Sequence, residues 1–212
     1  MQAKHYAPFI PAPTLAPAGA GIPAPDRFVA RRILLPIAML RVPWSRTADL
    51  MDKQADELGA ILNREHALAP SRATTPVLVP PMRGIEDSSR FWSLAMVAEH
   101  LRMVNQRLGD ILEHLALSRP LVSGPNQIAQ FKPDPGATIA ALDPLHRTIH
   151  RIRTIISQSG ENGRRSKGTV DHPWFGPLTA AQWAAFAPMH QNIHLKQAGL
   201  IVRGLDGPAR EG

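Results

Sequence analysis

The 212-residue chain contains no cysteine. This absence excludes disulfides, cysteine-ligated zinc, iron–sulfur clusters and a thiol nucleophile within the protein. Aromatic residues make up only 5% of the chain, with a single tyrosine, which argues against the base-stacking surface of a single-strand-binding protein. Because cysteine is absent, any metal site must use histidine, aspartate or glutamate, and nine histidines are present.

Long apolar runs are also absent, since a membrane span takes about 20 apolar residues. The most apolar segment, Ile33 to Leu40, has only eight residues and contains Pro36. Arg31 and Arg32 precede it as in a twin-arginine export signal, but no small-residue cleavage site follows closely. We expect a short helix or arm over residues 26–44, and a cytoplasmic protein that makes no membrane contact.

Proline, in contrast, is abundant: 21 residues of 212, against a usual share of roughly 5%. Residues 1–25 combine proline and alanine without periodicity, and they bury too little apolar surface to offset the entropy of ordering them. We interpret them as an extended or disordered tail. Proline and glycine also mark two connections, residues 70–87 and 120–136. We expect residues 45–205 to form one bundle domain, and 206–212 a C-terminal tail.

Four segments show apolar residues three or four positions apart, the spacing of an amphipathic helix. No sustained period-two alternation predicts a strand, and Thr179 with Gln182 has the spacing of a helix-opening capping box. The fold class that this pattern favours is all-α, a four-helix bundle. The predicted helices run from Ser45 or Thr47 to about Leu68, about Ser89 to Ser118, about Thr138 to Ser157, and Thr179 to about Val202.

Two histidines of the fourth predicted helix, His190 and His194, are four residues apart and project from one face. Such a pair can supply two ligands to zinc or a similar ion. His100 lies between Val97 and Val104 on the apolar stripe of the second helix and is the best candidate for a third ligand. A single histidine there would ordinarily be a hydrogen-bonded core residue, but three cannot all be buried cheaply without partners. We therefore predict a three-histidine site for a divalent metal.

A second pair, His146 and His150, has the same spacing on the third helix. Arg147, Arg151 and Arg153 surround it and would repel a dication, so we expect this pair to lie on the surface.

Further polar residues are candidates to support the metal site. Asn105, Gln191 and Gln197 can orient imidazole N–H groups, because a metal-bound histidine usually donates its other ring nitrogen. His172 precedes the fourth helix, and we expect it either to line the pocket or to pack in a loop fixed by Pro173.

The formal charge is +7, and the segment 145–170 is basic. Glu161 is its one acidic residue. A charge run of this kind is usually a solvated face, so binding to nucleic acid or another anion is the weakest alternative. The basic residues are Arg147, Arg151, Arg153, Arg164, Arg165 and Lys167.

Two segments carry a family resemblance. Phe91–Leu101, which opens with Phe-Trp-Ser and ends with Glu-His-Leu, resembles the second-helix signature of the DinB superfamily. Asp171–Leu178 reads Asp-His-Pro-Trp-Phe-Gly-Pro-Leu. Together with the predicted helix that follows it, this segment resembles the fourth-helix region of DinB-like proteins. The resemblance spans roughly Thr47 to Val202.

This resemblance implies a DinB-like four-helix bundle with a divalent metal, commonly zinc or nickel, held by His100, His190 and His194. Characterised members include thiol-dependent S-transferases and a mycothiol-dependent isomerase. It therefore implies a transferase or hydrolase with a small-molecule substrate, a low-molecular-weight thiol as partner and no nucleic acid, in a homodimer. A non-catalytic metal-binding or interaction protein on the same bundle remains the alternative. Pro188 departs from the pattern, and we expect it to kink the helix near Ala184 and so to threaten His190.

Overall fold

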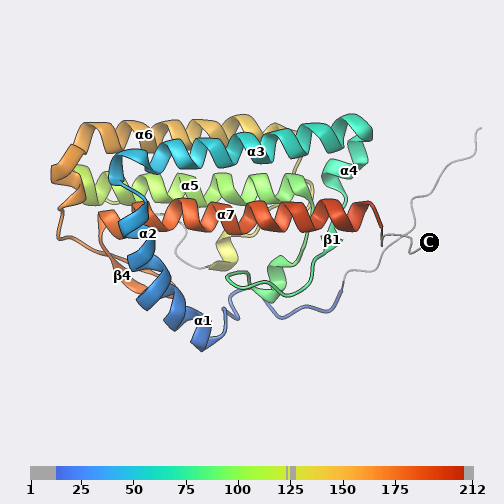
Figure 1. Cartoon of the computed structure of the whole chain (residues 1–212), viewed down its shortest axis with the longest axis horizontal. Coiled ribbons are helices and arrows are strands. Elements are labelled where there is room, and N and C mark those ends of the chain that lie inside the picture. Colours follow the sequence, from blue (N-terminus) through green and yellow to red (C-terminus); the bar gives the residue numbers. More distant parts are fainter. Residues whose placement is uncertain (1–12, 123, 125–127, 208–212) are drawn as a thin grey trace, which may run out of the picture.

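A computed structural model describes residues 13–122, 124 and 128–207. Four long helices dominate it, and each packs along two of the others: α3 and α5 both lie against α6 and α7 (Figure 1). Leucine, isoleucine and alanine side chains from all four fill the interior, as their helical spacing predicts. The long helices are α3 (Thr47–Leu68), α5 (Leu94–Leu117), α6 (Leu142–Arg164) and α7 (Ala180–Leu205).

The chain direction follows from the colours of Figure 1: α3 and α7 run one way along the bundle, and α5 and α6 run the other. Because α5 and α6 are parallel neighbours, the segment between them must return along the length of the bundle. This returning segment contains the 3₁₀ turns η4 (Ile128–Phe131) and η5 (Ile139–Ala141). It places Phe131, which belongs to no long helix, against His100 of α5.

Two small antiparallel hairpins precede α5 and α7. In the first, β1 (Val77–Leu78) pairs with β2 (Phe91–Trp92), and in the second, β3 (Val170–His172) pairs with β4 (Gly176–Leu178). The predicted helix start at Ser89 is therefore wrong. The short turn η3 (Asp87–Ser89) and strand β2 occupy the segment before Leu94. The fold is therefore mostly helical, with two short strand pairs, rather than all-α.

Side chains cap the helices that follow the hairpins. The Ser93 hydroxyl accepts a hydrogen bond from the Met96 N–H at the start of α5. At the start of α7, the Thr179 hydroxyl accepts from the Gln182 N–H, and the Gln182 side chain accepts from the Thr179 N–H at 2.9 Å. The predicted capping box is confirmed, and it fixes where the helix carrying two candidate ligands begins.

The third predicted helix has other bounds in the structure. Helix α6 continues to Arg164, beyond the predicted end at Ser157, and its regular geometry is broken only at Gly160, with φ 50° and ψ −142°. Helix α7 runs without interruption through the buried Pro188. The Pro188 carbonyl accepts a hydrogen bond from the Gln54 side chain of α3, which anchors this turn against the bundle.

The N-terminal arm is helical and packs on α7. It consists of α1 (Ala24–Val29), the π-helical segment η1 (Ala30–Leu34) and α2 (Leu35–Arg41). Pro36 has no N–H and its ring would clash with an earlier carbonyl, and the widened π-helical turn just before it relieves this conflict. The short helices η2 (Trp44–Arg46) and α4 (Pro70–Thr74) flank α3 on either side.

Part of the predicted tail is extended and held in place. Ile22 is buried, the Ala16 N–H donates to the Asp87 carboxylate, and the N–H groups of Gly19 and Gly21 donate to Glu86. Residues 1–12 and 208–212 lie outside the described residues. None of the helices in the described part of the chain has the length and hydropathy of a membrane span.

Candidate metal centre

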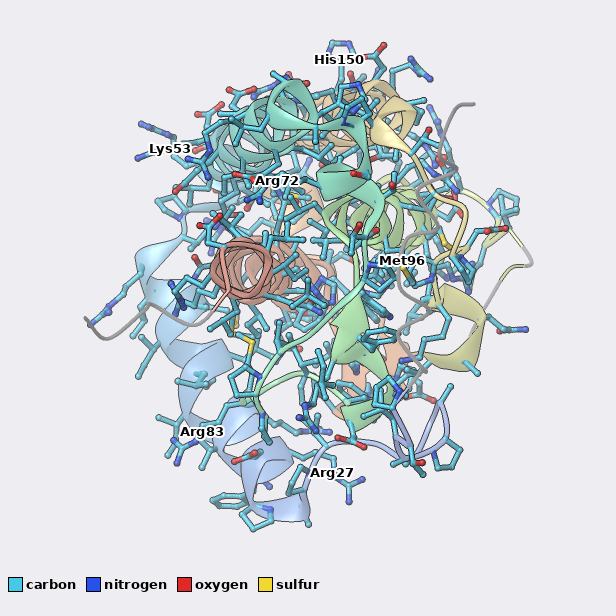
Figure 2. All side chains as sticks on the ribbon, turned by 90° about the vertical axis from the view of Figure 1, so that its right-hand side faces the viewer. Arg27, Lys53, Arg72, Arg83, Met96 and His150 are labelled. Atoms are coloured by element: carbon cyan, nitrogen blue, oxygen red, sulfur yellow. The ribbon has the colours of Figure 1, made fainter. Side chains whose placement is uncertain are left out.

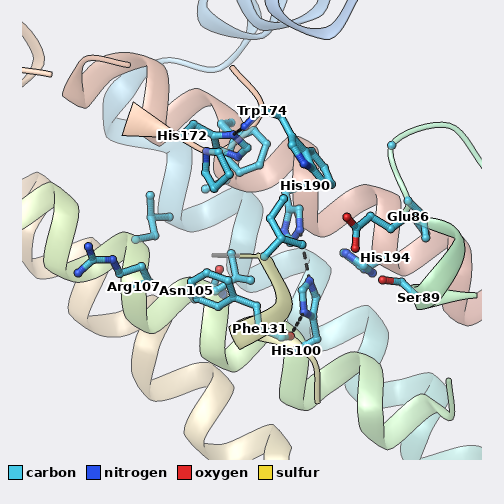
Figure 3. Close-up of a pocket in the computed structure, with 18 of the residues that line it drawn as sticks. Glu86, Ser89, His100, Asn105, Arg107, Phe131, His172, Trp174, His190 and His194 are labelled. Carbon is cyan, nitrogen blue, oxygen red and sulfur yellow. Dashed lines mark hydrogen bonds between the residues drawn. The ribbon is translucent and has the colours of Figure 1, made fainter. Parts of the chain in front are cut away.

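Three histidines from α5 and α7 meet inside the bundle. One ring nitrogen from each of His100, His190 and His194 lies within 4.8 Å of the others. The Nε2 atoms of His100 and His190 are 3.4 Å apart (Figure 3). Ligands on a tetrahedral zinc at about 2.0–2.1 Å are separated by roughly 3.3 Å. The donor set therefore fits a divalent metal ion.

The antiparallel crossing of α5 and α7 explains this convergence. His100 sits about two turns after the Ser93 cap, on the buried stripe of α5, and His194 is on the buried stripe of α7. His190 is one turn earlier on α7, and its ring lies 4.7 Å from that of His194 between ring centres. Pro188, only two residues before His190, does not move it out of the cluster.

Burial keeps the three imidazoles neutral. Loss of water, and then the neighbouring His194 ring, hold the pKa of His100 well below its ordinary value of 6.5. The pKa of His190 is lowered well below 6.5 for the same reasons. Desolvation lowers the pKa of His194 to about 4, although its hydrogen bond to Gln197 opposes the shift. The neutral ring is the form that binds a metal ion.

Hydrogen bonds orient two of the rings. His100 Nδ1 donates to the Phe131 carbonyl at 2.7 Å. His194 Nδ1 donates to Gln197 Oε1 at 2.8 Å, and the Gln197 amide is fixed because its Nε2 donates to the Ser89 carbonyl at 2.7 Å. With the proton on Nδ1, each Nε2 lone pair is free to coordinate a metal.

Asn105 and Gln191 serve a different purpose. The Asn105 amide donates to Gln191 Oε1 at 3.3 Å, and Gln191 Nε2 donates to the Met51 carbonyl at 2.6 Å. This buried chain ties α5 and α7 to α3 next to the site. Asn105 lines the cavity, but its hydrogen bond goes to Gln191 rather than to an imidazole.

Trp92 and Lys132 complete the surroundings of the cluster. The Trp92 ring stacks on His194 with an interplanar angle of 13°, and the Lys132 ammonium lies 5.4 Å from the Trp92 ring centre. Lys132 also donates to the Ser89 hydroxyl at 2.6 Å and is 3.3 Å from Glu86. Burial lowers the pKa of Lys132, and the Glu86 carboxylate partly opposes this shift.

The histidines open into a cavity of about 110 Å³, room for several water molecules. Figure 3 shows His172 and Trp174 on one side of this space and Phe131 and His100 on the other. The walls between them are mostly apolar. They include Val104, Leu108, Ile111, Ile128, Trp183 and Phe186.

His172 is a buried wall of this cavity. Its ring stacks on Phe175 at an interplanar angle of 16°, and its Nδ1 accepts a hydrogen bond from the Trp174 N–H at 3.1 Å. Desolvation lowers the pKa of His172 to about 3. Both sequence interpretations thus apply: His172 lines the pocket, and it is packed in the loop that Pro173 begins.

Sequence reasoning did not single out Phe131, Lys132 or Glu86. Phe131 and Lys132 belong to the segment predicted only as a connection, and no local pattern marks its path across the bundle. Glu86 belongs to the other predicted connection. A charged residue next to an aromatic one, as at Phe131-Lys132, was the only available signal.

The rival pair and the basic segment lie elsewhere. His150 projects from the outer surface of the bundle (Figure 2), and His146 is half-buried. Arg151 pairs with Asp110 and Glu113 of α5, and Arg153 pairs with Asp49 and Asp52 of α3. Arg151 and Arg153 therefore form ion pairs that link α6 to its neighbouring helices.

Fold and site together define a four-helix bundle with a buried three-histidine cluster. The chain is similar to a solved structure, that of TT2238, described as a four-helix bundle protein, with a TM-score of 0.50 and 21% identity over 73% of this chain and 96% of that one. At this identity the likeness concerns the fold alone, and it confirms the predicted helical bundle. No protein-family model and no curated protein sequence matches the chain.

Proposed function

We propose that this chain is a DinB-like metal-dependent protein in which His100, His190 and His194 hold one divalent cation, zinc or nickel. Its activity is the transfer of a low-molecular-weight thiol to a small-molecule substrate, or hydrolysis of that substrate. The observation that carries the proposal is the convergence of three neutral imidazoles on one point at the wall of a cavity.

Three protein ligands leave at least one coordination position for a substrate, which distinguishes catalytic from closed structural sites. His100, His190 and His194 would hold the metal, and a divalent metal bound there would lower the pKa of a thiol or water and so supply a nucleophile near neutral pH. Because the chain has no cysteine, the thiol must come from a cosubstrate.

The chain's own residues prepare the site. The Phe131 carbonyl and Gln197 orient the His100 and His194 rings, so little reorganisation is needed when the metal binds. Apolar walls such as Leu108 and Phe186 limit the water that can reach the reacting atoms.

Elemental analysis of the full-length protein purified from metal-replete medium tests the proposal. We expect about one zinc or nickel per chain, and loss of that metal in His100→Ala and His194→Ala. The exposed His150→Ala is the matched control and should keep its metal. A metal-free wild type, or full occupancy in both ligand variants, would contradict the site.

Turnover separates the enzyme from its alternative. We expect the metal-loaded protein to consume thiol-transfer or ester probes, and His190→Ala to abolish this turnover with the fold intact by circular dichroism. Bound metal without turnover of any such probe would instead favour the non-catalytic metal-binding protein.

A further inference from the structure

The cavity contains a second charged group that the metal proposal does not use. Arg107 lines the cavity and is more than nine-tenths buried, with 9% of its surface exposed. Among the described residues, its hydrogen bond is from Nη1 to the Val122 carbonyl at 2.8 Å, and its Nε is buried without a partner. No acidic side chain of the described residues forms an ion pair with it.

Such an arrangement is costly in an apolar setting. A guanidinium stays charged at any physiological pH and offers five N–H donors, and within the described part of the chain one of them has an acceptor, the Val122 carbonyl. Buried charges in proteins are normally paired, because burying one without a partner is strongly unfavourable. A bound anion would remove this cost.

The other cation of the cavity, the half-buried Lys132, is already neutralised. Lys132 lies against Glu86 and donates to the hydroxyls of Ser88 and Ser89. Lys132 therefore has a carboxylate partner within the protein, whereas the described residues offer Arg107 only the neutral Val122 carbonyl.

Arg107 and the metal centre face the same space from one helix. Arg107 follows His100 by seven residues on α5, which places it nearly on the same helical face and about 10 Å farther along the axis. Figure 3 shows Arg107 across the pocket from His194 and Glu86. The wall between the two ends is apolar and includes Val104, Leu108 and Phe131.

We propose that Arg107 binds the carboxylate of the substrate, whose opposite end reaches the three-histidine centre. The ligand class is a carboxylate with an apolar body about 10 Å long. The part played by the histidine end rests on the proposed function, but the carboxylate site at Arg107 does not.

The chemistry favours a carboxylate over a phosphate ester. The planar fork of one guanidinium matches the two oxygens of a monoanionic carboxylate. A dianionic phosphate in this apolar space would need a second cation, and Lys132 is engaged by Glu86.

The first experiment needs no metal. Metal-free protein is titrated with octanoate and with octan-1-ol, followed by the fluorescence of the tryptophans that line the cavity. We expect octanoate to bind roughly tenfold or more tightly than octan-1-ol, the difference that a charge-assisted hydrogen bond typically makes.

Variants assign that preference to one side chain. Arg107→Met should bind both ligands equally, with the affinity for octan-1-ol unchanged, and Arg107→Lys should keep part of the preference. Arg102→Met, on the same helix but paired with Glu99, is the control and should behave as the wild type. Equal binding of acid and alcohol by the wild type, or an undiminished preference in Arg107→Met, would overturn the proposal. Tighter binding of octyl phosphate than of octanoate would overturn the carboxylate assignment.

The second experiment tests the two-ended geometry. Cobalt-loaded protein is titrated with 8-mercaptooctanoate and 8-mercaptooctan-1-ol, and the thiolate-to-cobalt charge-transfer band is followed. We expect both thiols to produce the band, with the acid effective at roughly tenfold lower concentration only while Arg107 is present. A cobalt protein that gives no band would overturn the two-ended geometry. Failure to bind cobalt would refute the proposed function, and the octanoate titration would still decide the role of Arg107.

Discussion

Two imidazoles of the cluster, those of His100 and His194, are oriented by the hydrogen bonds of their Nδ1 atoms. Gln197 is fully buried, and it holds the His194 proton on Nδ1 while its own amide is fixed by the Ser89 carbonyl. The ring is thereby presented to a metal in one tautomer and one orientation. Support of this kind contributes to metal affinity although it never contacts the metal.

Replacing Gln197 should therefore weaken metal binding without removing a ligand. We expect Gln197→Met to reduce zinc affinity by about 10- to 100-fold in a competition titration with a chromophoric chelator. The exposed Gln158→Met serves as the control and should leave affinity unchanged. Equal affinities in the wild type and Gln197→Met would show that the His194 orientation is fixed by packing alone.

His172 should make stability depend on pH. Its pKa is about 3 in the folded protein and about 6.5 when unfolded, so below pH 6.5 the unfolded chain binds a proton that the folded chain does not. The stability contribution is complete above the unfolded pKa and falls as the pH is lowered toward 3. For metal-free protein, we expect the wild type to lose about 2.5 kcal/mol more than His172→Phe between pH 7 and pH 4.5.

Urea unfolding at the two pH values measures this difference. His150→Phe, which changes an exposed histidine, should follow the wild type. If His172→Phe loses stability as steeply as the wild type does, His172 is not the group that titrates.

At the scale of the element, two glycines test the backbone of the long helices. A Cβ at Gly199 in α7 or at Gly160 in α6 would meet no neighbouring atom within 4 Å, so a methyl group would cause no clash at either position. Gly160, however, has a φ of 50°. We expect Gly199→Ala to stabilise the protein by roughly 0.5–1 kcal/mol and Gly160→Ala to destabilise it by about 1 kcal/mol or more.

The measurement is the free energy of unfolding in urea for the two variants and the wild type. Opposite signs are expected, because alanine favours the helical geometry of Gly199 and disfavours the left-handed geometry of Gly160. Destabilisation by Gly199→Ala would mean that α7 departs from regular helix near that position.

The helices could be predicted from sequence because their signals are local. Apolar spacing located the four long helices, and the position of His100, His190 and His194 on those stripes anticipated that they would meet. The start of α5 was misplaced because Trp92 pairs with Val77, a contact that no periodicity reveals. Phe131 and Lys132 were missed because the path of their segment depends on α5 and α6 being parallel.

At the scale of the molecule, the N-terminal arm leaves an apolar surface open. Phe28 is 63% exposed and Leu40 is 85% exposed. Clusters of large exposed apolar side chains commonly mark an interface. The surface of α1, η1 and α2 includes Phe28, Val29, Ile33, Leu34, Ile37, Met39 and Leu40.

We expect a second copy of the chain to cover this surface, in keeping with the homodimer that the DinB resemblance implies. Light scattering after size exclusion should give a dimer for the wild type and a monomer for the double variant Phe28→Ser, Leu40→Ser. Leu68→Ser changes another exposed leucine, at the end of α3, and should leave the dimer intact. A monomeric wild type would refute the expectation.

Helix α3 packs mainly on α6 and α7 and hardly on α5, the next long helix in the chain. Helix α3 emerges first of the four, but its main neighbours, α6 and α7, are the last two to be made. During synthesis the apolar stripe of α3 stays without its partner helices until nearly the whole chain has been made. A nascent chain stalled before α7 should therefore be a substrate for chaperones, and the histidine cluster can form only after translation has passed His194.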